Sequence, residues 1–438
     1  MESMMKLITI LAALSLVASI CLAGDAGFRY SLAAQTAARG GLYVAGADGL
    51  TTTSINPSSL ACLPQNGIQL AVNNLTGQQE YKNQDDALYR SFKDQDYGVS
   101  GGFYWRATPK MTVALSTFNA ADYRANWPFA TYRTKASTIY TSGFDMAHRV
   151  RITAIAPSVA LQIGVVAIGL SANSYYIAQK TSLPVSNPAW FQDVGLSGYQ
   201  LEYELDGWSY GLNLGGMIQL SERWRGGLSL RSGYRAELSG VAKSNIYAEL
   251  DSIPATQVDI TSELAMPFQV AAGVVYQLSP EIDVNVDLNY SFWNGTQKTM
   301  PVTFAEDFWN SRLSAVDSLS GVQANNITTD MRNCIDFGLG VEYQPAKGLI
   351  YRLGYALRGT PVAPGSANLL SPTVNQHCFS LGIGHRTDTI ALDAALAYSI
   401  GQARTVTPAE NLYYAGIYDS HTIGLYLSLN YFFNPALP

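Results

Sequence analysis

Apolar and polar side chains alternate with a period of two along most of the chain after residue 66. Between Ile282 and Phe292 every even position is apolar and every odd position is polar. Successive side chains of a β-strand point to opposite faces, so this pattern indicates strands with one apolar and one polar face. Because the run reaches the roughly 9–11 residues of a tilted transmembrane strand, it predicts a chain that crosses a membrane as strands.

Fourteen such runs follow one another. They begin near Ile68, Tyr97, Met111, Arg149, Val165, Gln200, Trp224, Pro267, Ile282, Cys334, Leu349, His377, Ile390 and His421. Every second connection is short and the others are long, which is the arrangement of periplasmic turns and outer loops in outer-membrane barrels. We therefore predict an all-β fold in which residues 67–438 form a 14-stranded antiparallel transmembrane β-barrel.

One stretch allows a second interpretation. Residues Ile152–Gln179 carry no charge over 28 residues, a length that also suits a transmembrane helix. Pro157 and Gln162 disfavour a helix, and the alternation changes phase at Gly164. A tight turn between two strands produces such a change, so we interpret the stretch as a β-hairpin.

The first 66 residues do not alternate. Residues 1–23 have a basic residue, Lys6, then an uncharged apolar run and small residues before Gly24, the pattern of a secretory signal peptide. Residues 24–66 are rich in Gly and Ala. They form either a flexible periplasmic tail or a plug inside the barrel, and the wide lumen of a large barrel favours an ordered insert.

Composition agrees with a barrel in an outer membrane. Charged residues are only 14% of the chain and aromatic residues are 11%. The mean hydropathy of +0.04 is too low for a bundle of transmembrane helices, because outward apolar and inward polar residues of a barrel cancel. The net charge of −6 disfavours a nucleic-acid partner.

The chain shows no metal or disulfide framework. Cys62, Cys334 and Cys378 are an odd number of widely spaced cysteines beyond the signal region, and the chain contains four His. Cys334 and Cys378 are expected to face the lumen on strands separated by a third, too far apart for a disulfide. We therefore expect neither a metal nor a cofactor.

Four segments carry a family resemblance. They are Gly40–Asp48 with Ile55–Ala61, then Gly207–Asn213 with Leu228–Ser232, then Ala265–Trp293, and finally Leu353–Tyr355 with Thr360–Val362 and Ser380–Gly384. Their order and spacing resemble the FadL family of outer-membrane transporters of long-chain fatty acids and hydrocarbons. Ser58 and Ser59 replace the Ala and Gly of the family's Asn-Pro-Ala-Gly-Leu-Ala motif.

The resemblance implies a barrel plugged by an N-terminal hatch at residues 24–66. The hatch residues that match the family motif are Gly40, Gly41, Asp48, Asn56, Pro57 and Leu60. It also implies passive uptake: a hydrophobic molecule binds at the outer loops, then in a lumen pocket, and leaves by a hatch movement, often sideways into the membrane. The implied partners are a long-chain fatty acid or another hydrophobic small molecule and outer-membrane lipid, and the barrel is expected to act as a monomer.

Several arginines are candidates for binding a ligand carboxylate, because charge-assisted hydrogen bonds are strong. The strand phase places five of them on the lumen face, namely Arg225, Arg231, Arg235, Arg352 and Arg358. Lumen acids such as Asp283, Asp287, Asp336 and Asp393 offer an alternative set of partners for these cations. The sequence does not decide between the two.

A second candidate site lies in an outer loop. Residues Leu183–Tyr199 include Trp190 and Phe191, adjacent aromatic side chains that can form a binding patch for a hydrophobic ligand. They can equally fold beneath the loop or rest in lipopolysaccharide.

An enzyme is not expected. Gly98-Val99-Ser100-Gly101-Gly102 fits the nucleophile motif G-x-S-x-G, but that motif needs a strand–turn–helix, whereas here it lies within a predicted strand. The remaining alternatives are a barrel that binds a secreted protein or secretion machinery, and a general porin, which the predicted hatch disfavours. An apolar lumen pocket beneath an ordered hatch distinguishes the transporter from the binding scaffold.

Overall fold

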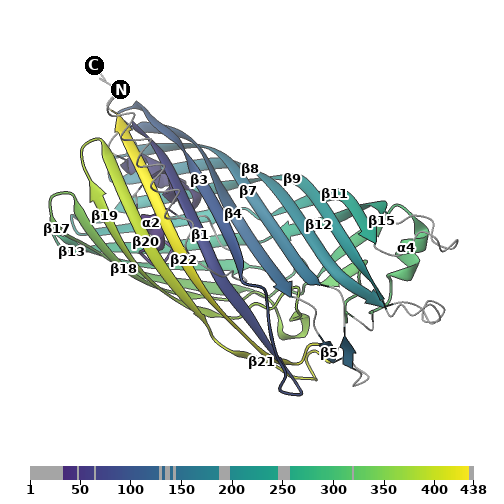
Figure 1. The fold of residues 1–438 in the computed structure, drawn as a ribbon. Helices are drawn as coiled ribbons and strands as arrows, with labels where there is room; N and C mark the ends of the chain where they lie inside the picture. The colour runs from purple at the N-terminus through teal and green to yellow at the C-terminus, as the bar shows by residue number, and fades with distance from the viewer. Residues whose placement is uncertain are drawn as a thin grey trace, which may run out of the picture.

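The computed structural model describes residues 33–46, 49–63, 66–127, 131–133, 139–141, 145–186, 198–244, 257–317 and 320–433. Nearly all their strands form one antiparallel barrel with strongly tilted strands, and one short two-stranded sheet is separate from it (Figure 1). Strand β1 (Asn66–Asn83) pairs along its whole length with the last strand, β22 (Gly416–Phe433), and this pairing closes the wall. Closure by β1 and β22 leaves no free first or last strand, as a barrel in lipid requires. The described residues therefore confirm the predicted closed 14-stranded barrel.

The seventh and eighth wall strands are each divided in two. In chain order the wall consists of β1, β3 (Asp94–Thr108), β4 (Met111–Trp127), β7 (Met146–Ile163), β8 (Val166–Ser186), β9 (Gly198–Gln219), β10 with β11 (Trp224–Arg231, Tyr234–Ser244), β12 with β13 (Gln257–Met266, Phe268–Ser279), β14 (Ile282–Phe292), β17 (Cys334–Ala346), β18 (Leu349–Arg358), β19 (Gln376–Arg386), β20 (Ile390–Gly401) and β22.

Short elements complete the described fold. They are β2 (Leu88–Arg90), β5 (Thr131–Arg133), β6 (Ile139–Thr141), β15 (Thr299–Phe304), β16 (Asn326–Thr328), β21 (Arg404–Val406) and the helices α2 (Ala34–Ala37) and α4 (Asp307–Arg312). No helix among the described residues is long and apolar enough to span a bilayer.

The uncharged stretch Ile152–Gln179 is the β7–β8 hairpin. Ile163 pairs with Val166, and Gly164 in the turn between them has a φ of +60°, a left-handed conformation that favours glycine. The hairpin interpretation is therefore confirmed, and the change of phase at Gly164 is the turn itself.

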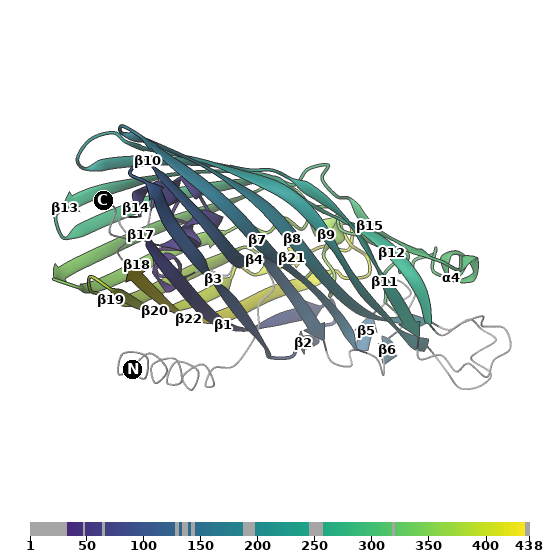
Figure 2. The same ribbon diagram turned by 90° about the horizontal axis from the view of Figure 1, so that it is seen from above.

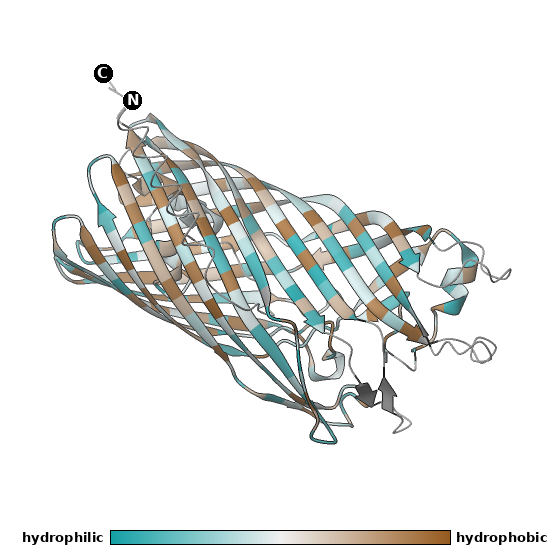
Figure 3. Ribbon diagram, viewed as in Figure 1, coloured by the Kyte–Doolittle hydropathy of each residue, from teal (hydrophilic) through white to brown (hydrophobic). Residues whose placement is uncertain are grey.

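The outer face of β9 shows how the wall meets the membrane. From the outer end inward, its outward positions carry the acidic Glu202, Glu204 and Asp206, then Trp208 and Tyr210. The aliphatic Leu212, Leu214 and Ile218 complete this face. An aliphatic band bordered by aromatic residues is the pattern of a barrel surface in lipid. The alternation of hydrophobic and hydrophilic positions is visible along the wall strands (Figure 3).

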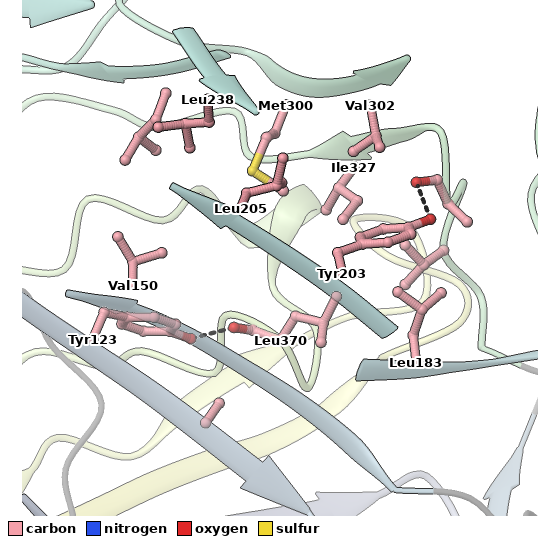
Figure 4. Packing of buried hydrophobic residues seen from close by; sticks show 14 of the residues in the cluster. Tyr123, Val150, Leu183, Tyr203, Leu205, Leu238, Met300, Val302, Ile327 and Leu370 are labelled. Carbon is pink, nitrogen blue, oxygen red and sulfur yellow. Dashed lines mark hydrogen bonds between the residues drawn. The ribbon is translucent and has the colours of Figure 1, made fainter. Parts of the chain in front are cut away.

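The outer half of the lumen is filled by loops. Two connections, within residues 293–333 and 359–375, pack apolar side chains against the inner faces of the wall strands (Figure 4). Tyr123 donates a hydrogen bond to the carbonyl of Leu370, and Tyr203 donates one to the carbonyl of Ala324 at 3.0 Å. The largest apolar cluster among the described residues therefore lies inside the barrel, beneath its outer rim.

Candidate functional site

The N-terminal segment, residues 33–46 and 49–63, lies inside the barrel (Figure 2). Every described residue of the segment is buried except Ile55 and Cys62, which are half-buried. Helix α2 is followed by Gly40 and Gly41, whose φ values of +82° and +72° reverse the chain. Two short 3₁₀ turns follow, Leu50–Ser54 and Pro57–Cys62.

Asn56 organises the second half of this segment. Its side-chain oxygen accepts hydrogen bonds from the backbone N–H and the hydroxyl of Ser58, which caps the turn that Pro57 begins. Its Nδ2 donates to the carbonyl of Val44 at 2.7 Å and to that of Gly216 on β9 at 3.2 Å. One side chain therefore links both halves of the segment to the wall.

Glycines on the inner face of the wall allow the segment to approach closely. A Cβ on Gly215 would lie 1.9 Å from Oδ1 of Asn56, and one on Gly169 would lie 2.4 Å from the backbone of Pro57. A Cβ on Gly227 would lie 2.5 Å from the carbonyl oxygen of Val44. Glycine within a strand often marks such close approach, so the inward phase of these positions was a signal that our sequence analysis did not use.

Three of the candidate arginines bind the backbone of the N-terminal segment. Arg358 donates to the carbonyl of Gly40 at 2.9 Å. Arg225 donates to the carbonyl of Ala45, and Arg231 donates to that of Ser54. A ligand role for these residues stays a prediction, and their observed partners belong to the segment.

Arg352 lies in a buried ion cluster. It contacts Glu342 at 2.7 Å and Asp393 at 2.6 Å, and Glu342 also binds Arg39 of the N-terminal segment. Asp393 is one of the lumen acids named as an alternative partner for the arginines. Arg39 and Glu342 are functional candidates that the sequence analysis did not name.

The predicted lumen position of Arg235 is wrong. Its neighbours Ala236 and Leu238 face the interior, and Arg235 is exposed on the outer face, paired with Glu263. The cause is the break between β10 and β11 at Ser232 and Gly233. Across this break the strand has one residue more than the paired stretch of β9, so the inward and outward positions are exchanged beyond it.

Three other candidates cannot be placed. Trp190, Phe191 and Asp48 lie outside the described residues. The remaining hatch candidates, Gly40, Gly41, Asn56, Pro57 and Leu60, all lie in the buried segment. The motif Gly98–Gly102 lies within β3 and pairs with β1, so it lacks the strand-to-helix turn of a hydrolase nucleophile.

A cavity of about 120 Å³, here called the inner chamber, lies between the N-terminal segment and the outer loops. Its floor includes Ala37, Gly40 and Gly41 of the segment. Its walls include Ala120, Met266, Trp293, Val374 and Tyr426, with the polar Asp336, Arg358 and Gln376. Cys334 and Cys378 both line the chamber, and both are free thiols, as the strand phase predicted.

The wall beside the inner chamber is irregular at β3 and β4. These strands pair between Gly101 and Thr108 of β3 and Met111 and Thr117 of β4. The outer part of β3, from Asp94 to Ser100, pairs with β1 but not with β4. The pairing of β4 with β7 shifts in register between Asn119 and Ala121, and Ala120 and Ala121 line the inner chamber at this point.

Solved structures with the same fold include outer-membrane channels. A Pseudomonas aeruginosa FadL homologue is 13% identical and superposes with a TM-score of 0.70 over 95% of this chain and 99% of that chain. The Ralstonia pickettii toluene transporter TbuX is 17% identical, with a TM-score of 0.66 over 92% of this chain and 99% of that chain. The Pseudomonas putida toluene transporter TodX is 14% identical, with a TM-score of 0.64 over 95% of this chain and 100% of that chain.

No curated protein matches the sequence. Residues 15–433 match the family described as outer membrane protein transport protein (OMPP1/FadL/TodX). The family match covers both the N-terminal segment and the whole barrel. This chain therefore belongs to the OMPP1/FadL/TodX family of hydrophobic-compound transport channels, and its place is the outer membrane of a Gram-negative bacterium.

Proposed function

We propose that this chain mediates passive uptake of hydrophobic small molecules and that its N-terminal segment is the hatch. The observation that carries the proposal is the inner chamber, which has the segment as its floor and the outer loops as its roof. A molecule in this chamber contacts Gly40 and Gly41 directly, so its presence can alter the docking of the segment.

The inner chamber favours a small neutral ligand. An engineered cavity of about 150 Å³ binds benzene in another protein, so a chamber of about 120 Å³ suits a single ring or a short part of a chain. Asp336 lines the chamber and would repel a carboxylate. Two of the similar structures are described as toluene transporters, in agreement with a ligand of this size.

A long-chain fatty acid is the second candidate. Arg358 is the one cation among the described lining residues of the inner chamber, and it can attract a carboxylate. Such a ligand would compete with the Gly40 carbonyl for the guanidinium group. This competition would couple ligand binding to release of the hatch.

The exit route we propose is sideways into the membrane. The irregular pairing of β3 and β4 adjoins the inner chamber at Ala120 and Ala121, which supports a path through the wall. The scaffold alternative finds no support among the described residues, because loops 293–317, 320–333 and 359–375 pack within the outer lumen.

Uptake of labelled toluene and labelled oleate tests the proposal in a Gram-negative host that lacks its own transporters for both. We expect the full-length chain to raise the initial rate of toluene uptake above that of the empty host. A variant without residues 35–61 serves as the hatch control and should also admit hydrophilic dyes. A folded barrel in the outer membrane that carries neither compound would contradict the proposal.

A further inference from the structure

A second, smaller cavity lies on the outer side of the inner chamber. This outer chamber has a volume of about 40 Å³ and is lined by Tyr123, His148, Met300, Ile327 and Leu370, among others. Trp293 and Thr373 line both chambers. They are the described residues shared by the two linings, so they lie at the boundary between the chambers, here called the partition.

Hydrogen bonds hold residues on both sides of the partition. Asn294 and Asn333 exchange hydrogen bonds from each backbone N–H to the other side chain, at 2.8 and 3.3 Å. The backbone N–H of Thr296 donates to the carbonyl of Trp293 at 2.9 Å. On the opposite side the hydroxyl of Thr373 bonds that of Thr360 at 2.5 Å. Trp293 is the larger of the two residues at the partition, so a change in the orientation of its side chain would open the most space between the chambers.

The Trp293 ring is well suited to this role. It is only 4% exposed, and it follows directly after β14, whose last residue, Phe292, packs against Phe268 on the outer face. The strand end is thus anchored in the wall, while the next side chain reaches between two cavities. A large apolar ring can fill the passage between two chambers and, once it has turned aside, offers an apolar surface to a hydrophobic molecule.

We propose that Trp293 is the gate between the outer and inner chambers and that it limits the size of the molecules that pass. The gated ligand is the neutral hydrophobic molecule of the proposed function, on which this inference rests. Rotation of the indole opens the partition, and the Thr373 side remains fixed.

Thiol labelling tests this gate without measuring transport. Cys378 lines the inner chamber and reports arrival of a reagent there. Cells carrying the protein are treated with the very small neutral reagent methyl methanethiosulfonate or with the larger, bicyclic monobromobimane, and mass spectrometry follows the peptide that contains Cys378. We expect Trp293→Ala to accelerate labelling by methyl methanethiosulfonate about tenfold and labelling by monobromobimane more strongly. Trp293→Phe should lie between Trp293→Ala and the wild type.

Trp309→Ala is the matched control. Trp309 is a buried Trp of the outer-loop cluster that lines neither chamber, so its removal loosens the loops without opening the partition. The proposal is overturned if Trp293→Ala leaves labelling unchanged, or if Trp309→Ala accelerates it equally. Because labelling reports access alone, the gate and the uptake function can fail separately.

Discussion

Arg39 of the N-terminal segment forms an ion pair with Glu342 of β17 inside the barrel, where their side chains are 1% and 6% exposed. Arg352 bridges Glu342 to Asp393, so two cations and two anions lie together in the lumen. Only Arg39 comes from the segment. The neutrality of this cluster therefore depends on the segment remaining docked.

Replacing Arg39 by Ala should loosen the N-terminal segment. The change leaves a net negative charge in the buried cluster, and breaking a buried ion pair from one side typically costs about 3–5 kcal/mol. Hydrogen exchange of residues 33–46 should accelerate strongly, while the strands keep their protection. The double variant Arg39→Ala with Glu342→Gln should recover part of the protection, and unchanged exchange in the single variant would show that the pair does not hold the segment.

Gly215→Ala should displace the segment, whereas Gly216→Ala should not. A Cβ at position 215 would overlap Asn56 Oδ1 at 1.9 Å, whereas one at 216 would have open space within 4 Å. Forced overpacking of this kind costs about 1–3 kcal/mol. Single-channel recording in planar bilayers should show a higher conductance for the first variant only, and equal conductance of both would argue against the close contact.

Asn56→Ala should destabilise docking of the second half of the segment. The loss of an N-cap costs about 0.5–2 kcal/mol, and the bonds to the carbonyls of Val44 and Gly216 are lost as well. Asn56→Ser keeps a capping oxygen but loses the amide donor, so its effect should be smaller. Limited proteolysis within residues 49–63 measures the difference, and equal cleavage of wild type and Asn56→Ala would refute this role.

Arg358→Ala should separate the two candidate ligands. If a carboxylate binds in the inner chamber, loss of a charge-assisted bond worth about 1.5–3 kcal/mol should weaken oleate binding at least tenfold. Toluene binding should change little, because toluene carries no charge. Arg235→Ala is the control, since this exposed arginine lies on the outer face. Calorimetry on the purified barrel measures both ligands, and undiminished oleate affinity in Arg358→Ala would exclude this carboxylate contact.

The alternation of apolar and polar residues was sufficient to predict the strands of the barrel wall. Side chains on a strand alternate between its two faces, so a sequence such as Ile282–Phe292 predicts both that the segment is a strand and which of its side chains face the membrane. The same local rule located the turn at Gly164, where the phase changes. It failed at Arg235, because a break at Ser232 and Gly233 reverses the phase without a distinct turn signal.

The sequence by itself determined the barrel, its short turns and the lumen position of Arg358, because these follow from local periodicity. Only the tertiary structure decided that Arg358 contacts the Gly40 carbonyl, that Arg39 meets Glu342, and that Trp293 lies between two chambers. These contacts join residues roughly 300 positions apart or depend on how loops fill the lumen. Periodicity carries no information about either, since it reports which face a side chain occupies and not what lies opposite it.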